Sequence, residues 1–492
     1  MKKLKFSFIN LGCNKNLVDT QFLLWNIFSI AWNNPNYEVD YITDPYDNEV
    51  EFVFLNTCGF ISSGRYEMFE EIDKLLNAGK KIYLLGCALQ YFEKILCHSE
   101  EQSDEEYKKK FNKLDSSLRS EWQNELNKRS EIVKNPNIHN ISRSDWDKIS
   151  IKQILTWFDS KKFWESPIFK WVRAYTNIDY WFEYLKIAEW CNNQCTFCII
   201  PKIRWKQKSL PIEDVVKQAQ ELVYNWSKEI ILLAQDTNRY GVDLYGKSML
   251  FELLEELEKI DWDFMYRILY LYPDILTLKH LEKLKNLKKF IPYFDIPLQH
   301  INPEILKRMW RFYDKNHILN LLDFIDKNFK ERFIRTNIIV WFPWETEKEF
   351  DELCEFLQNY HFDNVALFEY HDEPLAESSK LDLKVDESEI HRRFEILKWI
   401  INENMSSWAL AKDINLDSSL RSEWQWKSSK WNKNIWYIIW FEWDESDPTI
   451  IVRPRLHAPE IDEYDKIKLK NITWIFADNE NLEIWDKILY KK

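Results

Sequence analysis

The sequence predicts an α/β protein: an N-terminal open parallel sheet, then a longer β/α series, then a small all-β domain. Two observations support this prediction. Apolar strand-like runs alternate with amphipathic helix-like stretches over the first ninety residues and again from about residue 184. After residue 426 only short strand-like runs follow. Strands separated by helices pair in parallel, whereas closely spaced strands form antiparallel sheets and barrels.

The composition fits a globular protein of several domains. Of 492 residues, 45 % are hydrophobic and 30 % are charged, which excludes a disordered or collagen-like chain. No apolar run approaches the roughly 18–20 residues that span a bilayer, and the N-terminal stretch is too short for an export signal. A net charge of −13 argues against a general nucleic-acid coat protein. We therefore expect a cytoplasmic protein without a membrane partner.

Three apolar runs in the first ninety residues each end in a cysteine. The runs are KLKFSFINLGC, VEFVFLNTCGF and KIYLLGC, and the cysteines are Cys13, Cys58 and Cys87. QFLLWNIF and RYEMFEEIDKLL have helical spacing and complete a βαβ pattern. Because the carboxyl ends of parallel strands meet at one sheet edge, we expect the three cysteines to converge where open α/β sheets bind ligands. Three unrelated buried cysteines are the alternative.

Residues 98–135 are charged and lack an apolar period. Within them, the string LDSSLRSEWQ at 114–123 recurs unchanged at 416–425, too far away for a structural repeat of 20–50 residues. We therefore expect two inserted, mobile and solvent-exposed segments. The predicted domains are 1–155 (with 98–135 as an insert), 180–410 and 426–492, with a repeat insert at 411–425.

The β/α series after residue 184 predicts a partial barrel. Its candidate strands are YLKIAE, EIILLA, FMYRILYLY, YFDIPL, FIRTNIIV and NVALFEY, and amphipathic helices such as IEDVVKQAQELVYN and EKEFDELCEFLQNY lie between them. Six such units suit an incomplete α/β barrel with its site at the carboxyl ends of the strands. His300, after the fourth strand, either faces the barrel mouth or is structural. NIWYIIWFE, TIIVRP, DKIKLKNI and DKILY predict the small all-β barrel that follows.

The strongest chemical motif is CNNQCTFC at 191–198, directly after the first strand of this series. Its cysteines, Cys191, Cys195 and Cys198, have C-x3-C-x2-C spacing. Three thiolates on one loop suit three corners of a cubane iron–sulfur cluster and leave one iron open to a cofactor or substrate. A structural zinc ion takes four protein ligands, and no fourth cysteine or histidine lies nearby in the sequence. A zinc site or a redox thiol is therefore the weaker interpretation.

This motif resembles the signature of the radical S-adenosylmethionine (SAM) superfamily. Together with LGCNKNLVDT, LNTCGF, LGC, CNNQCTFCIIPKIR and the small C-terminal domain, it resembles the methylthiotransferase family over nearly all of the chain outside the inserts. The resemblance implies two 4Fe-4S clusters, a SAM-binding one on Cys191, Cys195 and Cys198 and an auxiliary one on Cys13, Cys58 and Cys87. It also implies a TRAM-like C-terminal domain and cofactor contacts from Phe197, Gln235, Trp341, Pro343 and Trp344.

Several strings resemble the branch of this family that modifies an aspartate of ribosomal protein S12. They are RILYLYPD, PYFDIPLQHI, APEID and LAQDTNRYG. The branch that modifies tRNA adenosine has a histidine before the proline of the first string and glutamine–serine–glycine after the strand of the second. Residues 426–492 hold 11 Lys and Arg against 12 Asp and Glu, whereas a domain that clamps tRNA would be basic. We expect a basic protein substrate, possibly on the ribosome, an electron donor, and no stable nucleic-acid complex.

The resemblance implies the reaction. An electron from the SAM-binding cluster would cleave the cofactor to a 5′-deoxyadenosyl radical, which would take a hydrogen from the β-carbon of the target aspartate. The auxiliary cluster would then deliver sulfur, and a second SAM would supply the methyl group. Two alternatives remain open at this point. They are the same chemistry on tRNA adenosine and a non-catalytic iron–sulfur binding protein.

The glycine and tryptophan counts are anomalous. The chain has 7 Gly beside 25 Trp, whereas an average usage of ~7 % predicts roughly 34 glycines. Several tryptophans stand at turns or where the family has glycine: Trp190, Trp205, Trp226, Trp310, Trp341, Trp344 and Trp485. At Trp226, where a helix leads straight into a strand, the backbone should be left-handed, which glycine accepts and tryptophan resists. We therefore predict that the source reads UGA codons as glycine at these positions.

Overall fold

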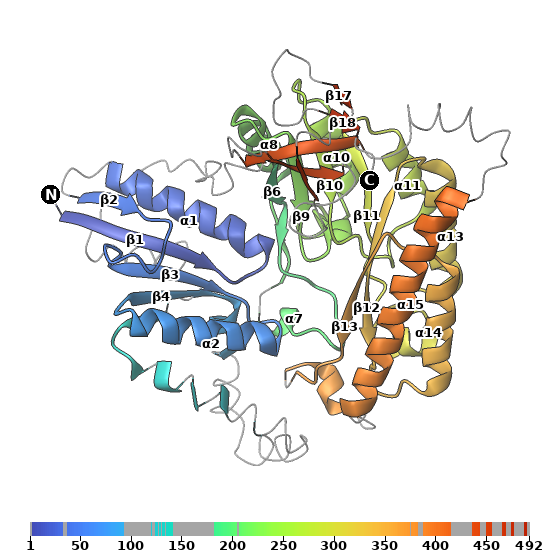
Figure 1. Ribbon diagram of the computed structural model, residues 1–492, viewed down its shortest axis with the longest axis horizontal. Helices are drawn as coiled ribbons and strands as arrows, with labels where there is room; N and C mark the ends of the chain where they lie inside the picture. Colours follow the sequence, from blue (N-terminus) through green and yellow to red (C-terminus); the bar gives the residue numbers. More distant parts are fainter. Residues whose placement is uncertain are drawn as a thin grey trace. The chain divides into compact units, whose positions relative to one another are not determined.

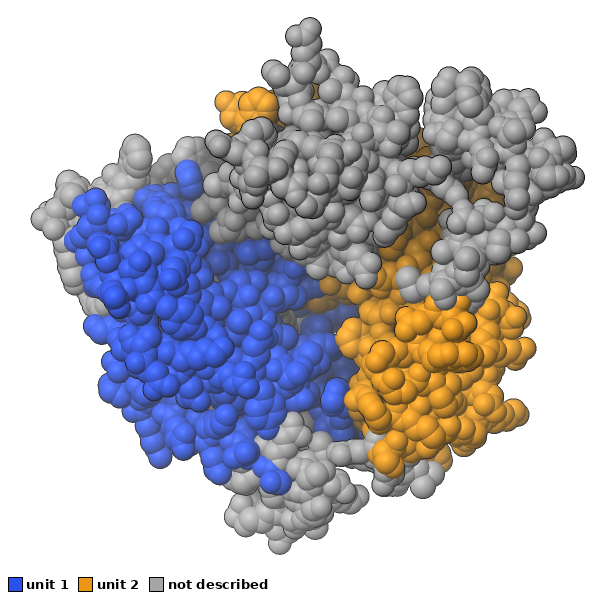
Figure 2. Space-filling view, in the orientation of Figure 1, with its two compact units in different colours: residues 1–176, 189–208, 371–380 blue, residues 177–188, 209–370, 381–492 orange. Residues whose placement is uncertain are grey.

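The computed structural model describes residues 2–32, 37–92, 182–203, 206–373, 375–381 and 387–414, parts of 120–140, and five strands after residue 434 (Figure 1). The chain divides into two compact units (Figure 2). Unit 1 comprises residues 1–176, 189–208 and 371–380, and unit 2 comprises residues 177–188, 209–370 and 381–492. Sequence reasoning had assigned 189–208 and 371–380 to the barrel domain, so their grouping with the N-terminal sheet was not predicted. No helix in the described part of the chain could cross a membrane.

Unit 1 contains the predicted parallel sheet, with strand order β2-β1-β3-β4-β5. The strands are β1 (Lys2–Asn10), β2 (Tyr37–Tyr41), β3 (Phe52–Thr57), β4 (Lys81–Gly86) and β5 (Ile138–Asn140), with helices α1 (Asn14–Trp32) and α2 (Ser62–Asn77). Every residue of β3 is buried, as expected of a continuous apolar strand covered on both faces. Phe54 shares a core with Leu24 of α1, and Val53 shares the opposite core with Phe69 of α2.

The end of the predicted insert 98–135 does not behave as a solvent-exposed segment. Glu125 and Ile132 are both buried. Glu125 forms an ion pair with the Nε of Arg65 at 3.1 Å, and Ile132 joins the core on the α2 side of the sheet. The prediction of an exposed segment is wrong here, because a charged side chain with a buried partner looks in the sequence like a solvated one. The repeated strings lie outside the described residues, apart from Ser120.

Unit 2 contains the six predicted β/α strands in one parallel sheet, with order β13-β12-β11-β10-β9-β6. The strands are β6 (Phe182–Lys186), β9 (Glu229–Leu233), β10 (Met265–Ile268), β11 (Phe290–Asp295), β12 (Phe333–Val340) and β13 (Asn364–Glu369). The helices are α8 (Ile212–Tyr224), α9 (Val242–Tyr245), α10 (Leu250–Glu258), α11 (Leu278–Lys285), α12 (Pro303–Arg308), α13 (Lys315–Asn328), α14 (Glu347–Asn359) and α15 (Glu387–Ile414). At least one helix separates each pair of consecutive strands, so the predicted (β/α) arrangement is confirmed.

Helices α2, α8 and α12 end with the same hydrogen-bond pattern. In each, the amide two residues beyond the C-cap donates to the carbonyl five residues before it, at 3.0 Å in α2 and α8 and at 2.8 Å in α12. The residue in between is left-handed, and it is Gly79 in α2 (φ +71°), Trp226 in α8 (φ +73°) and Trp310 in α12 (φ +61°). This helix ending favours glycine because a Cβ there crowds the following carbonyl. Two tryptophans therefore occupy backbone positions that a glycine fills in the third helix.

The other described tryptophans of the predicted set share this backbone conformation. Trp190, Trp341 and Trp344 have φ of +66°, +70° and +74°. Among the remaining described non-glycine residues, only Tyr270 and Gln299 have positive φ. Trp205 and Trp485 lie outside the described residues. The left-handed conformation predicted at Trp226 is confirmed and extends to four further positions, whereas the identity of the natural residue stays a prediction.

Five antiparallel strands follow residue 434, in the order β16-β15-β14-β18-β17. They are β14 (Ile435–Glu442), β15 (Thr449–Pro454), β16 (Asp465–Lys468), β17 (Trp474–Phe476) and β18 (Lys487–Leu489). Four of them match the predicted runs, and β17 was not predicted. Closure into a barrel and a TRAM-like character stay predictions.

Candidate active site

Cys13, Cys58 and Cys87 follow the carboxyl ends of β1, β3 and β4. These three strands are neighbours and pair in parallel, so their ends meet at one edge of the sheet. Cys13 is exposed, Cys58 is partly buried and Cys87 is buried. Burial, together with the nearby Cys87 and Cys13, raises the pKa of the Cys58 thiol to about 11. The predicted convergence at one sheet edge is confirmed, and the role of these cysteines as cluster ligands stays a proposal.

Asn16 links two of these thiols. Its buried side chain contacts the Sγ of Cys13 at 3.9 Å and the Sγ of Cys87 at 3.8 Å, and its amide donates to the carbonyl of Thr57 at 3.1 Å. It lies in the first turn of α1, three residues after Cys13. Sequence reasoning missed Asn16, and the only signal was its place one helical turn beyond a cysteine.

Glycines let the backbone segments beside the cysteines approach one another closely. A Cβ on Gly59 would lie 2.5 Å from the carbonyl oxygen of Cys87, and one on Gly86 would lie 2.4 Å from that of Thr57. No three His, Cys, Asp or Glu side chains in the described residues converge on a single metal ion. In a cubane cluster, however, each thiolate binds a different iron, so its ligands stand further apart. Cys13, Cys58 and Cys87 offer three soft sulfur donors at one sheet edge. Such donors suit an iron–sulfur cluster better than they suit a single hard cation, which prefers oxygen ligands.

Cys191, Cys195 and Cys198 lie between β7 (Ala188–Glu189) and α7 (Ile200–Ile203). All three thiols are partly exposed. The amide of Cys198 donates to the carbonyl of Cys195 at 3.0 Å, and the amide of Asn193 donates to the Sγ of Cys191 at 3.4 Å. An N–H directed at sulfur stabilises the thiolate, the form that binds iron. The loop is therefore folded by its own backbone in a way that suits three cluster ligands.

This loop is part of the same compact unit as the three N-terminal cysteines. Ile199 and Ile203, just after the motif, belong to the hydrophobic core that also contains Cys87. The amide of Ser378 donates to the carbonyl of Thr196 at 2.9 Å, which holds the segment 371–380 against the loop. The two cysteine triads therefore belong to one folded unit.

Arg65 organises the surroundings of Cys58. Its guanidinium is buried, pairs with Glu125 and with Glu373 at 3.1 Å each, and donates to the carbonyl of Gly59 at 3.2 Å. Gly59 directly follows Cys58, so this network fixes the loop that carries the thiol. Sequence reasoning missed it because the three charged residues lie far apart in the chain.

The predicted cofactor contacts are divided between the units. Phe197 is in unit 1 and partly exposed, whereas Gln235, Trp341, Pro343 and Trp344 are in unit 2. Gln235 follows β9, and its Oε1 is buried without a hydrogen-bond partner in the described residues. An unpaired buried carbonyl is costly, so this position suits a polar ligand.

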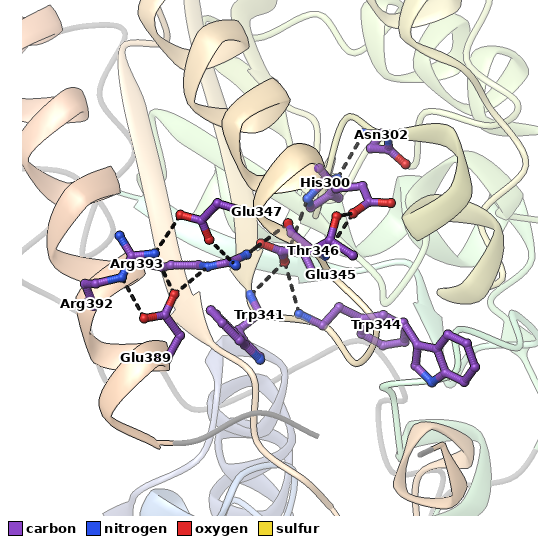
Figure 3. A network of polar contacts seen from close by, with 12 residues as sticks. His300, Asn302, Trp341, Trp344, Glu345, Thr346, Glu347, Glu389, Arg392 and Arg393 are labelled. Carbon is purple, nitrogen blue, oxygen red and sulfur yellow. Dashed lines mark hydrogen bonds and ion pairs between the residues drawn. The ribbon is translucent and has the colours of Figure 1, made fainter. Parts of the chain in front are cut away.

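The turn Trp341–Trp344 connects β12 to α14 and is held by a buried carboxylate (Figure 3). The Oε2 of Glu345 accepts from the amides of Trp341 at 2.9 Å and Phe342 at 3.2 Å. Arg393, from α15, pairs with the Oε1 of Glu345 at 2.9 Å, and its guanidinium lies 3.8 Å from the ring centroid of Trp341. Burial raises the pKa of Glu345 to about 7, and Arg393 opposes that shift. A helix far along the chain thus fixes the backbone of this turn.

His300 is fully buried beside this network (Figure 3). Its Nδ1 accepts from the amide of Asn302 at 2.9 Å, and its Nε2 lies 3.9 Å from the Oε2 of Glu345. Burial lowers its pKa to about 3, so the ring is neutral near pH 7. These contacts fit the structural alternative for His300.

Two family profiles match the chain. The Radical SAM superfamily matches residues 185–357, and Uncharacterized protein family UPF0004 matches residues 5–105. Among solved structures, the radical SAM methyltransferase TsrM from Kitasatospora setae is similar, with a TM-score of 0.47, 9 % identity and 75 % coverage of each chain.

Curated relatives match over most of their length. The ribosomal protein uS12 methylthiotransferase RimO of Dictyoglomus thermophilum is 34 % identical over 95 % of this chain and 96 % of its own. RimO of Clostridium acetobutylicum is 33 % identical over 84 % of this chain and 85 % of its own. RimO of Clostridium kluyveri is 36 % identical over 79 % of each chain. The chain is a radical SAM methylthiotransferase and belongs to the RimO family.

Proposed function

We propose that this enzyme adds a methylthio group to the β-carbon of an aspartate in ribosomal protein uS12. The observation that carries the proposal is the 34 % identity to a uS12 methylthiotransferase over 96 % of that relative. Two cysteine triads in one folded unit support it, because the reaction needs two sulfur-bound iron clusters to act on one substrate.

Each cysteine triad would hold one of the two iron–sulfur clusters. Cys191, Cys195 and Cys198 would hold the cluster that binds SAM, and Cys13, Cys58 and Cys87 would hold the auxiliary cluster. When bound, these groups supply the electron, the radical chemistry, the sulfur and the methyl group. The family profile supports SAM and an iron–sulfur cluster, and the second triad supports two 4Fe-4S clusters.

The protein itself supplies ligands, orientation and contacts to the cofactor. Asn16 and the tight backbone at Gly59 and Gly86 would hold the auxiliary thiols in position. The amide of Asn193 would donate a hydrogen bond to the Sγ of Cys191. SAM would be contacted by Phe197, Gln235, Trp341, Pro343 and Trp344.

The partners follow from charge and chemistry. A net charge of −13 favours a basic substrate such as a ribosomal protein, free or on the ribosome. The reaction also needs an electron donor. The near-neutral charge of residues 426–492 supports the absence of a stable nucleic-acid complex. A ribosomal substrate supports a cytoplasmic location.

A deletion strain tests this function. Mass spectrometry of uS12 and of tRNA from that strain should show loss of the methylthio group from uS12 alone. Complementation with the parent gene or with Cys354→Ser should restore it, since Cys354 lies on α14 in unit 2 and belongs to neither triad. Cys58→Ser should not restore it. Loss of methylthio from tRNA alone would contradict the proposal and favour the tRNA-adenosine reaction. Purified, reconstituted protein that never cleaves SAM under reduction would favour a non-catalytic protein.

A further inference from the structure

A buried ion cluster lies directly beside the loop that carries Cys58. It consists of Arg65, Glu125 and Glu373, and each of these side chains is at most 7 % exposed. The Nη2 of Arg65 lies 3.1 Å from the Oε2 of Glu373, and both terminal nitrogens donate to its Oε1 at 3.3 Å. Such a forked contact fixes orientation as well as distance. Arg65 is thus joined rigidly to a residue 308 positions away in the sequence.

Glu373 also caps the helix that follows this loop. Helix α2 begins at Ser62, and its N-cap residue, Ile61, provides no side-chain hydrogen bond. The carboxylate of Glu373 accepts a hydrogen bond from the amide of Ser62. A carboxylate at this end of a helix satisfies a free N–H group and interacts favourably with the helix dipole. Because Arg65 also donates to the carbonyl of Gly59 at 3.2 Å, Glu373 is tied to both ends of the loop.

The backbone just beyond Glu373 contacts the second cysteine loop. The amide of Ser378 donates to the carbonyl of Thr196 at 2.9 Å, and Thr196 directly follows Cys195. A tight turn joins the two contacts, because the amide of Ala376 donates to the carbonyl of Glu373 at 2.8 Å. Ala376 is buried in the hydrophobic core on the α2 side of the sheet of unit 1. This short segment therefore contacts the loop of each triad within one unit.

We infer that Glu373 is a positioning residue that sets the distance between the two cysteine triads. This inference rests on the proposed function, in which both triads hold clusters that act on one substrate. The carboxylate of Glu373 is occupied by Arg65 and by the amide of Ser62. Glu373 therefore acts through the two loops that its segment holds, and the substrate does not need to contact it.

Loss of this carboxylate should separate the two parts of the reaction. Cleavage of SAM depends on the loop at 191–198, whereas sulfur attachment also requires the auxiliary triad at its set distance from that loop. A misplacement of about 1 Å can cost about 100-fold in rate. Glu373→Gln should therefore still cleave SAM, while forming less methylthio-uS12 for each 5′-deoxyadenosine that is released.

Glu373→Gln removes one buried charge but leaves a balanced pair. Arg65 keeps its contact with Glu125 at 3.1 Å, whereas replacing Arg65 would leave two buried carboxylates without a counter-charge. The matched control is Glu377→Gln on the same segment. The carboxylate of Glu377 is 45 % exposed and pairs with Lys202 and Lys380, so solvent screens its ion pairs.

A second variant breaks the other end of the segment. Ser378→Pro removes the amide that donates to Thr196 and does not alter the buried ion cluster. Ser378 lies in the first turn of the short 3-10 helix Glu377–Lys380, where proline is tolerated. Urea unfolding midpoints are compared with the parent. If the midpoint of Glu373→Gln is lower, Ser378→Pro decides the test.

Two measurements are made on each reconstituted holoenzyme. One is amide hydrogen exchange in the peptides over 191–198 and 371–380, and the other is the ratio of methylthio-uS12 to 5′-deoxyadenosine. Glu373→Gln and Ser378→Pro should exchange faster in both peptides and lower the ratio at least about tenfold, with the iron content of the parent. Glu377→Gln should match the parent in both measurements.

Three results would overturn the inference: unchanged exchange, an unchanged ratio beside faster exchange, or a loss of iron that accounts for the lower ratio. The last result would mean that Glu373 is needed only to retain a cluster. If the parent enzyme does not modify uS12 at all, the proposed function fails. Hydrogen exchange then still tests whether Glu373 holds the two loops together.

Discussion

Five tryptophans in the left-handed region are the strongest residue-scale signal in this chain. Each costs about 1–2 kcal/mol relative to an allowed conformation, so together they cost about 5–10 kcal/mol, as much as the whole stability of many domains. The indole N–H groups of Trp190 and Trp341 are also buried without acceptors in the described residues. Glycine would remove all of these costs. The backbone thus supports the prediction that composition alone suggested.

Replacing Trp226 by glycine should stabilise the protein. The side chain is 71 % exposed, so little packing is lost, and the strain of the left-handed position is relieved. We expect a gain of about 1 kcal/mol in the free energy of unfolding, measured by urea denaturation. The control is Trp399→Gly, because Trp399 is 61 % exposed in the middle of α15, where glycine costs about 1 kcal/mol. A loss of stability at both positions would contradict the account.

The gene provides a direct check of the glycine prediction. We expect UGA at the codons for Trp190, Trp341 and Trp344, and glycine at these positions in the intact mass of the protein isolated from its source. The physical reason is that a bare backbone fits the left-handed turn and leaves room for the cofactor. UGG codons there would rule the idea out, and we would then expect a poorly folded cluster loop and weak SAM binding.

His300 should make stability depend on pH. Its pKa in the folded protein is lowered from 6.5 to about 3, so the unfolded state binds the proton first as the pH falls. Stability is therefore fully present above about pH 6.5 and is lost as the pH falls towards about 3. From about pH 7 to about pH 5.5 the free energy of unfolding should drop by about 1 kcal/mol more in the parent than in His300→Asn. His391→Asn, at an exposed position, is the control and should behave like the parent. Equal pH slopes for parent and His300→Asn would contradict this prediction.

At the scale of elements, apolar periodicity predicted most of the fold. The six strands of unit 2 and the neighbouring strands β1, β3 and β4 appear where buried runs were expected. The placement of the cysteines could be predicted because they are close in sequence or follow equivalent strands, and their role as cluster ligands stays a proposal. Asn16, Arg65 and Glu345 could not be predicted, because their roles depend on partners that only the tertiary structure brings near. Glu125 shows the same limit. As a charged residue in a charged segment it was expected to be exposed, but it forms a buried ion pair with Arg65.

The buried pair at the end of β12 should be important for stability. Arg393 is 4 % exposed and Glu345 is fully buried, so Arg393→Met leaves a carboxylate without its main counter-charge. We expect a loss of about 3 kcal/mol in urea unfolding. Arg392→Met is the matched control on the next residue, where a 44 % exposed guanidinium pairs with Glu347 and Glu389. That control should cost much less than Arg393→Met, because an exposed ion pair is screened by solvent. Equal losses for both variants would contradict the assignment of Glu345 and Arg393 as the support of the turn.

At the scale of the whole molecule, the grouping of the cysteine triads is the main new feature. The loop that carries Cys191, Cys195 and Cys198 and segment 371–380 belong to the unit built on the N-terminal sheet. Contact between segments so far apart in sequence leaves no local pattern, so it could not be predicted from composition or periodicity. This grouping agrees with a reaction that uses both triads on one substrate.

The most direct test separates the roles of the two triads in one assay. Purified enzyme is reconstituted with iron and sulfide, reduced, and incubated with SAM and uS12, and both 5′-deoxyadenosine and the mass of uS12 are measured. The parent and Cys354→Ser should cleave SAM and add a methylthio group to uS12. Cys195→Ser should do neither, whereas Cys58→Ser should cleave SAM and leave uS12 without the methylthio group. Methylthiolation of uS12 by Cys58→Ser, or an unmodified uS12 beside a modified tRNA with the parent enzyme, would contradict the account.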